Sequence, residues 1–182
     1  MQCVCGWYIH LLPVTVASEH VPAFAQVYRN VGIDGLVEIH ILHPQKPLVA
    51  LAHKLGVTVT AYAPIGSPGR SEVIKGDAFV EGNPLDHPLV KRLAEKYGKT
   101  PAQILIRQLI QRGISTIPKS TNPNRVRENF NVLDFELTAD ELAEFDQIGS
   151  DKRLFLFEFA KNHPWHPWKA DLKKVLGYEL AA

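Results

Sequence analysis

The sequence predicts an α/β fold built from parallel βα units. Three short runs rich in apolar and β-branched residues, at positions 36–41, 57–62 and 114–118, have the length and composition of buried strands. A pattern typical of a helix follows each of them along the chain. Because strands that alternate with helices fold into a parallel sheet covered by helices, we expect such a sheet in this part of the chain.

The ends of the predicted helices are clearly marked. Thr100 and Thr138 each begin a capping box, in which a side chain three residues later, Gln103 or Glu141, bonds back to the start of the helix. Glycine, which favours the backbone conformation that ends a helix, follows four of the helical patterns. These glycines are Gly56, Gly98, Gly113 and Gly149.

Composition narrows the class of protein. The chain has 182 residues, of which 46% are hydrophobic, as in an ordinary globular protein. Its 20 Lys and Arg against 19 Asp and Glu leave a net charge of +1, so we expect neither nucleic acid nor a membrane surface as a partner. The two cysteines, Cys3 and Cys5, lie too close together for a disulfide between them to cross-link a core, which favours a reducing, cytoplasmic location.

Three regions follow from the pattern. Residues 1–34 do not join the βα alternation and stay unassigned, residues 35–149 form the βα region, and residues 150–182 form a tail. The tail becomes aromatic around Trp165 and Trp168, which could cover a substrate pocket or pack against the rim of the sheet.

A strand that runs into a helix start around residues 115–125 predicts an anion site. Asn122 suits the N-cap and Pro123 the first helical position. Lys119, Ser120 and Arg125 lie close enough in sequence to surround a phosphate at this helix N-terminus. The alternative is that the two cations are solvated charges beside a capped helix.

Four short motifs then occur in one order along the chain. They are Ala-Tyr-Ala-Pro-Ile-Gly-Ser at 61–67, Lys-Thr-Pro-Ala-Gln at 99–103, Ile-Pro-Lys-Ser at 117–120 and Arg-Val-Arg-Glu-Asn at 125–129. In this order they resemble the C-terminal part of the aldo-keto reductase family, over about residues 35–150. The resemblance implies an incomplete (β/α)8 TIM barrel that contains only the C-terminal βα units, with its site at the carboxyl ends of the strands.

The resemblance also implies a cofactor, NADPH/NADP, and the residues that bind it. In the family a tyrosine stacks on the nicotinamide ring, the next loop follows the pyrophosphate, and a Lys, a Ser and an Arg hold the adenosine 2′-phosphate. The matching positions are Tyr62 for the nicotinamide, Ile65 and Ser67 for the pyrophosphate, Lys119, Ser120 and Arg125 for the 2′-phosphate, and Glu128 and Asn129 for the adenine side.

Three departures from the family pattern concern the same cofactor. Leu36 stands where the family has a glutamine that holds the nicotinamide carboxamide, and a leucine side chain neither donates nor accepts a hydrogen bond. Ala63 replaces the serine after the stacking tyrosine. Gly69 stands where the loop that closes over the cofactor often has an acidic residue, which puts closure in doubt.

The catalytic residues of the family are missing from the sequence. The family's proton donor is a tyrosine in an Asp-x-Ala-x-x-Tyr stretch, and this chain has none. His10 lies in a segment that loosely resembles the strand of the catalytic histidine, although a divergent leader without a chemical role explains that segment better. We therefore assign no catalytic residue.

Two hypotheses follow. The first is a truncated or alternatively spliced NADPH-dependent aldo-keto reductase, whose completed form would reduce a small carbonyl substrate and which is inactive alone. The second is a non-catalytic partial barrel that binds nucleotide or a protein partner. Under either hypothesis, a three-stranded sheet leaves open edges that a protein partner or self-association would cover.

Two histidine pairs do not predict a metal site. His40 and His43 follow a strand, and His163 and His166 lack nearby carboxylate or thiolate ligands. Glu38 and His40 share one face of a strand and are expected to be structural.

Overall fold

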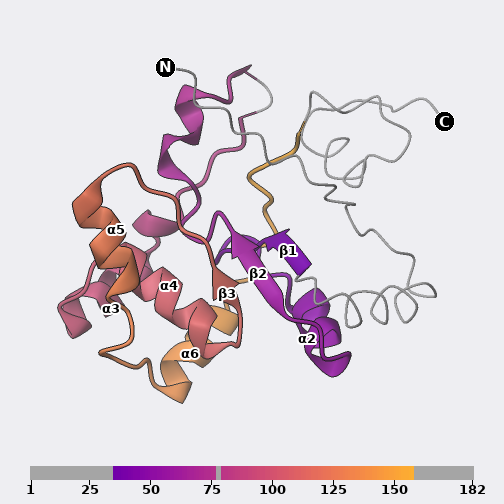
Figure 1. Cartoon of the computed structure of the whole chain (residues 1–182), viewed down its shortest axis with the longest axis vertical. Helices are drawn as coiled ribbons and strands as arrows, with labels where there is room; N and C mark the ends of the chain where they lie inside the picture. The colour runs from indigo at the N-terminus through magenta and orange to yellow at the C-terminus, as the bar shows by residue number, and fades with distance from the viewer. Residues whose placement is uncertain (1–34, 77–78, 158–182) are drawn as a thin grey trace.

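The computed structural model describes residues 35–76 and 79–157, drawn in colour in Figure 1. Residues 1–34, 77–78 and 158–182 lie outside the described part, and with them His10, both cysteines and the tail histidines and tryptophans. The elements, in chain order, are β1 (Gly35–Glu38), α2 (Lys46–Lys54), β2 (Val59–Tyr62), the 3-10 helices η1 (Pro68–Glu72) and η3 (Pro84–Asp86), α3 (Pro88–Tyr97), α4 (Pro101–Gln111), β3 (Ser115–Thr116), α5 (Pro123–Phe130) and α6 (Ala139–Asp146).

The three strands form one parallel sheet in the order β1-β2-β3, which confirms the predicted βα alternation. Each strand is shorter than predicted because only part of each apolar run has a neighbour in register. β3 is reduced to two residues, which pair with Thr60 and Ala61.

Helices cover one face of this sheet (Figure 1). Side chains at alternate positions on β1 and β2 point to this face and pack against α2 and α4. The buried members of this cluster are Ile39, Val49, Val59, Ala61, Leu109 and Ile114. The intervening residues, Leu36 and Glu38 on β1 and Thr60 and Tyr62 on β2, belong to the opposite face, where their register pairs them.

A second apolar cluster joins α3, α4 and the chain around α6. Its buried members are Ile41, Leu89, Val90, Leu93, Ala94, Ile104, Leu105, Leu137 and Phe145. α4 contributes to both clusters, since Leu109 faces the sheet and Ile104 and Leu105 face α3. It is therefore the central helix of the described region.

The predicted helix caps are confirmed. Thr100 with Gln103, and Thr138 with Glu141, form complete capping boxes, and Gly98 ends α3 in the left-handed conformation at φ 60°. The Asn122 side chain accepts hydrogen bonds at the start of α5. α6 ends at Asp146, three residues before the predicted glycine. None of the helices in the described ranges is long and apolar enough to cross a membrane.

Candidate functional site

The carboxyl ends of parallel strands meet at one edge of a sheet, and several of the predicted site residues lie at this edge. Tyr62 is the last residue of β2 and lies opposite Glu38 of β1. The backbone N–H of Ile117 donates to the carbonyl of Ala61 over 3.2 Å, which keeps the chain after β3 beside the end of β2. The structure thus brings the Tyr62 loop and the 117–120 segment to the same edge.

Tyr62 is held between the sheet and the segment that follows α6. Its ring contacts that of Phe155 edge-to-face, with the ring centroids 6.0 Å apart and the planes at 75°. Burial raises the pKa of the Tyr62 hydroxyl and the negative charge of Glu38 raises it further, while Arg153 acts in the opposite direction. The hydroxyl therefore stays protonated and Tyr62 offers an uncharged aromatic ring.

The loop after Tyr62 has an unusual backbone. Ala63, Gly66 and Ser67 have positive φ angles of 51°, 76° and 46°. A Cβ on Gly66 would lie 2.3 Å from Cδ of Pro84, so this position accepts only glycine without a shift of its neighbours. Ile65 packs against the cluster around α3 and α4, and Ser67 is half-buried at the start of η1.

Arg70, which sequence reasoning did not select, fixes this loop from inside. Its side chain is 7% exposed and donates to the carbonyls of Gly66 over 2.6 Å, Val80 over 3.0 Å and Gly82. The guanidinium also lies 5.1 Å from the ring centre of Phe79. In the sequence, only its position after a glycine-rich loop marks Arg70. That position does not reveal which carbonyls the side chain reaches.

The predicted anion group spans the segment after β3 and the first turn of α5. Lys119 and Arg125 are exposed, and neither forms an ion pair with a described residue. The Ser120 hydroxyl accepts from the N–H of Asn122 over 3.1 Å, while the Asn122 side chain accepts from the N–H groups of Asn124 and Arg125. Hydrogen bonds of Ser120 and Asn122 therefore fix the backbone of this segment, and both cations are exposed beside it.

Glu128 and Asn129 lie on the same side of α5 as Arg125, three and four residues further on. The Glu128 side chain is exposed and Asn129 is half-buried. Gln103 Nε2 donates to the carbonyls of Glu128 and Asn131, over 3.2 and 2.8 Å, and so fixes the end of α5 to the start of α4.

A buried carboxylate lies beneath the same edge. Glu38 is 1% exposed, and its Oε1 bonds to His40 Nε2 over 2.9 Å and to the backbone N–H of Leu154 over 2.6 Å. Oε2 lies 3.4 Å from the guanidinium of Arg153. The prediction of a structural role for Glu38 and His40 is confirmed, but their partners after α6 were not foreseen.

His43, the other histidine of this segment, also has a structural contact. His43 Nδ1 lies 2.6 Å from Asp151, and burial lowers the pKa of His43. Within the described residues no group of three or more potential metal ligands comes together.

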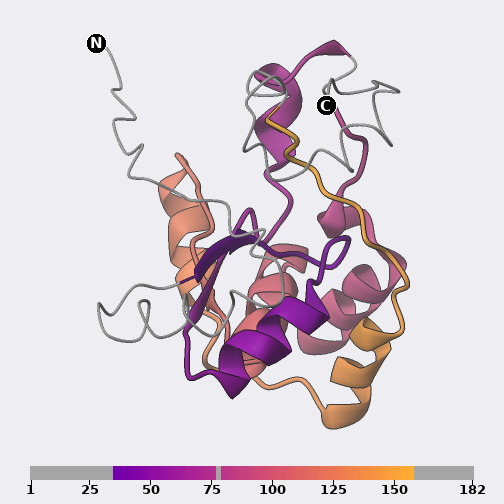
Figure 2. The ribbon, with the colours of Figure 1, turned by 90° about the vertical axis from the view of Figure 1, so that its right-hand side faces the viewer.

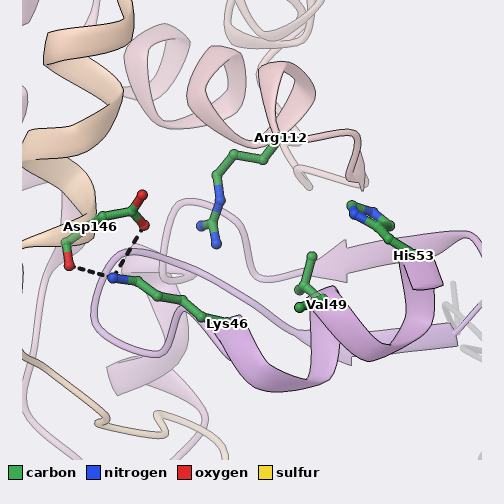
Figure 3. Close-up of a pocket in the computed structure, with 6 residues that line it drawn as sticks. Lys46, Val49, His53, Arg112 and Asp146 are labelled. Atoms are coloured by element: carbon green, nitrogen blue, oxygen red, sulfur yellow. Dashed lines mark hydrogen bonds and ion pairs between the residues drawn. The ribbon is translucent and has the colours of Figure 1, made fainter.

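A surface hollow lies apart from this edge, between α2, α4 and α6, and Lys46, Val49, Ala50, His53, Arg112 and Asp146 line it. Figure 3 shows Arg112 reaching from the end of α4 toward α2, and Lys46 paired with Asp146. His53, Arg112 and Asp146 mark the C-terminal ends of the three helices, where partial negative charge favours cations. The helix ends thereby explain His53 and Arg112, and the ion pair with Asp146 explains Lys46, so the basic side chains do not indicate an anion site.

The comparisons with known proteins agree on one family. The sequence model described as "Aldo/keto reductase family" matches residues 36–150. The chain is 40% identical over 118 residues to 9,11-endoperoxide prostaglandin H2 reductase of Trypanosoma cruzi, covering 65% of this chain and 38% of that protein. It is also 40% identical over 139 residues to aldo-keto reductase family 1 member A1-A of Danio rerio, covering 76% of this chain and 42% of that protein.

Solved structures give the same result. The structure of Bombyx mori aldo-keto reductase AKR2E4 in complex with NADP matches with a TM-score of 0.63 at 35% identity, over 78% of this chain and 47% of that one. The aldose reductase of Schistosoma japonicum matches with a TM-score of 0.61 at 36% identity, over 74% of this chain and 39% of that one. The chain therefore spans less than half the length of these relatives.

Proposed function

Because the chain belongs to the aldo/keto reductase family, we propose that it carries the NADP(H)-binding part of a carbonyl-reducing oxidoreductase. The family has a (β/α)8 barrel, and the described three-stranded parallel sheet with its helices is a partial α/β fold of that kind. The observation that carries the proposal is a pair of exposed cations, Lys119 before α5 and Arg125 in its first turn, neither of which forms an ion pair with a described residue.

The residues fit the phosphate end of NADP(H). Lys119 and Arg125 supply two positive charges beside the Ser120 hydroxyl, and such groups bind a phosphate through charge-assisted hydrogen bonds. The Bombyx mori relative was solved with NADP. We propose the same cofactor for this chain, with Glu128 and Asn129 beside the adenine.

The residues fit the nicotinamide end less well. Tyr62 offers an uncharged ring, and Ile65 and Ser67 lie on the loop next to it. Leu36 is on the same face of β1 as Glu38, where it gives no hydrogen bond to a carboxamide. We therefore expect a cofactor held mainly through its phosphates.

NADPH, when bound, supplies a hydride to a carbonyl carbon. The chain's own contribution is to neutralise phosphate charge and to support the ring with Tyr62. A reduction also needs a proton donor, and none of the sequence matches the family's Asp-x-Ala-x-x-Tyr stretch. We expect this polypeptide by itself to bind the cofactor without reducing a carbonyl.

The second candidate function is a non-catalytic nucleotide-binding module. Leu36, Ala63 and Gly69 favour it because each removes a polar group that the family uses around the cofactor. Both candidate functions predict that the chain binds NADPH, but only the reductase predicts carbonyl reduction. A turnover assay therefore separates them when the chain is combined with the other strands of a family barrel.

A titration tests the binding site. NADPH fluorescence or calorimetry is recorded with the natural chain, with Lys119→Ala plus Arg125→Ala, and with Lys54→Ala plus Arg127→Ala as a control of equal charge change. We expect the first double variant to lose about 100-fold or more in affinity, since each charge-assisted bond contributes about 1.5–3 kcal/mol. The control should bind nearly as the natural chain does. Equal loss in both variants, or no binding by the natural chain, would refute the proposal.

A turnover assay tests whether the chain reduces a carbonyl by itself. NADPH oxidation is followed at 340 nm with an aromatic aldehyde, and we expect no rate above the protein-free control. A rate that scales with protein and disappears in the Lys119 and Arg125 variant would show that the chain is a reductase by itself.

A further inference from the structure

Ser67, which the family resemblance assigns to the pyrophosphate, adopts a backbone conformation that is rare for serine. Its φ of 46° lies in the left-handed region. Although Ser67 is the N-cap of η1, its side chain makes no cap hydrogen bond. Its backbone N–H also donates to no residue within 35–76 and 79–157. Ser67 therefore keeps two hydrogen-bond donors available, on a backbone that neighbouring groups have to hold in place.

Arg70 holds the peptide groups on both sides of Ser67. Its Nη1 donates to the carbonyl of Gly66 over 2.6 Å, and its backbone N–H donates to the carbonyl of Ser67 over 2.9 Å. Because the C=O and the N–H of a planar trans peptide point in opposite directions, the bond to the Gly66 carbonyl turns the N–H of Ser67 away from the guanidinium. The Arg70 side chain thus fixes the direction of one of the two donors.

The same guanidinium is anchored on its other side. Its Nη2 donates to the carbonyls of Val80, over 3.0 Å, and of Gly82, and the group lies 5.1 Å from the ring centre of Phe79. Val80 is itself buried in a small apolar cluster with Leu154. In Figures 1 and 2 this loop extends from the end of β2, with η1 near the top of both views. The side chain therefore ties the peptide before Ser67 to a buried part of the fold.

Arg70 also places a positive charge inside the loop. Its side chain is 7% exposed and forms no ion pair with a described carboxylate. Burial lowers the pKa of Arg70 and the negative charge of Glu38 opposes this, but a guanidinium remains charged. A buried positive charge one peptide group from Ser67 favours an anion there, because little water screens it.

We propose that Arg70 is a positioning residue for the pyrophosphate of the dinucleotide, which it aligns with the N–H and hydroxyl of Ser67 without touching it. The inference rests on the proposed NADP(H) function and adds to it the residue that shapes the pyrophosphate contact. Arg70 acts from inside the loop, so this arrangement does not need the acidic residue that Gly69 replaces. Both donors of Ser67 can then bind phosphate oxygens.

Two nucleotides separate this role from general stability. NADPH contains a pyrophosphate, whereas adenosine 2′,5′-bisphosphate has the 2′-phosphate but no pyrophosphate. Arg70→Lys keeps the charge and loses the planar fork that reaches the Gly66 carbonyl. In calorimetry we expect this variant to bind NADPH about tenfold or more weakly, and the bisphosphate as the natural chain does. Arg92→Lys, at an exposed position on α3, is the control and should bind both nucleotides normally.

Hydrogen exchange tests the same role in the natural chain, which keeps the test decisive if Arg70→Lys does not fold. The amide of Ser67 donates to no described residue, so it should exchange fast in the free protein. Saturating NADPH should slow this exchange about tenfold or more, and the bisphosphate should leave it unchanged.

The outcomes distinguish this inference from the proposed function. Equal losses of both nucleotides in Arg70→Lys would show that Arg70 only stabilises the fold, and no loss of either would show that the pyrophosphate does not depend on it. Binding of both nucleotides without slower exchange at Ser67 would also overturn the inference, while the 2′-phosphate site at Lys119 and Arg125 would stand. If the natural chain binds neither nucleotide, the proposed function fails and the inference fails with it.

Discussion

The carboxylate of Glu38 accepts a hydrogen bond of 2.6 Å from the backbone N–H of Leu154, which lies 116 residues further along the chain. This bond ties the segment after α6 to the end of β1. Leu154 and Leu156 are buried there with Val80, and Phe155 meets the ring of Tyr62. The final part of the described chain is thus held at the carboxyl edge of the sheet. It passes beside β1 in Figure 1 and rises from α6 along the right-hand side in Figure 2.

Replacing Glu38 should release this segment. Glu38→Gln removes the charge that faces Arg153 while keeping the size of the side chain, and losing one member of a buried pair costs about 3 kcal/mol. We expect a lower free energy of unfolding in urea and faster hydrogen exchange at the Leu154 amide. Glu72→Gln, at an exposed position, should change neither. Glutamine keeps an oxygen that can accept from Leu154, so unchanged exchange at this amide would show that the charge of Glu38 does not hold the segment.

Arg70 should be required for the loop between β2 and η3. Arg70→Lys keeps the charge but cannot reach the carbonyls of Gly66, Val80 and Gly82 together, because an ammonium group lacks the planar fork. We expect a loss of about 2 kcal/mol in stability and faster hydrogen exchange in residues 66–76 and 79–82. Arg92→Lys, which alters an exposed pair with Glu144, is the control and should leave stability almost unchanged. Similar effects of the two variants would contradict the role of the fork.

Substitutions at Asn122 separate the helix cap from the anion site. Asn122→Ala removes the bonds to the N–H groups of Asn124 and Arg125 and should cost about 1 kcal/mol of stability. Asn122→Asp retains a capping oxygen, so its stability should stay near that of the natural chain. The added negative charge beside Lys119 and Arg125 should nevertheless weaken NADPH binding several-fold in a titration. Unchanged NADPH affinity in Asn122→Asp would argue against a phosphate at this position.

The stability of the chain should fall in acid because of Glu141. Burial raises the pKa of Glu141, but hydrogen bonds from Lys96, Tyr97 and the N–H of Thr138 outweigh it and lower the pKa to about 2. A carboxyl with a lowered pKa stabilises the fold above its unfolded pKa, and this contribution disappears as the pH falls toward about 2.

Urea unfolding at a series of pH values between 5 and 2 measures this loss. Glu141→Gln keeps a side chain that suits a capping box but cannot titrate, so its stability should depend less on pH over this interval. A pH dependence identical to that of the natural chain would show that other carboxyls cause the acid loss.

Local rules explain what the sequence alone could predict. A capping box spans three residues, so Thr100 with Gln103 and Thr138 with Glu141 could be read directly and are confirmed. The order of motifs from residue 61 to residue 129 identified the family, since several motifs in one order leave little room for chance. The α/β alternation followed from the spacing of apolar runs.

The tertiary structure decided the contacts between distant residues. Nothing near Glu38 in sequence indicates that Leu154 and Arg153 reach it, and the three carbonyls that Arg70 binds depend on how a whole loop folds back. Which apolar side chains stay exposed is also a property of the assembled fold, because Val126 and Phe130 differ from buried residues only in having no neighbour among the described residues that covers them. The sequence by itself determined the helices, their caps and the family, which depend on short-range patterns. The edge at which Tyr62 and the 117–120 segment meet, and the apolar side chains that the described residues leave uncovered, depend on which segments meet in space, and only the tertiary structure shows that.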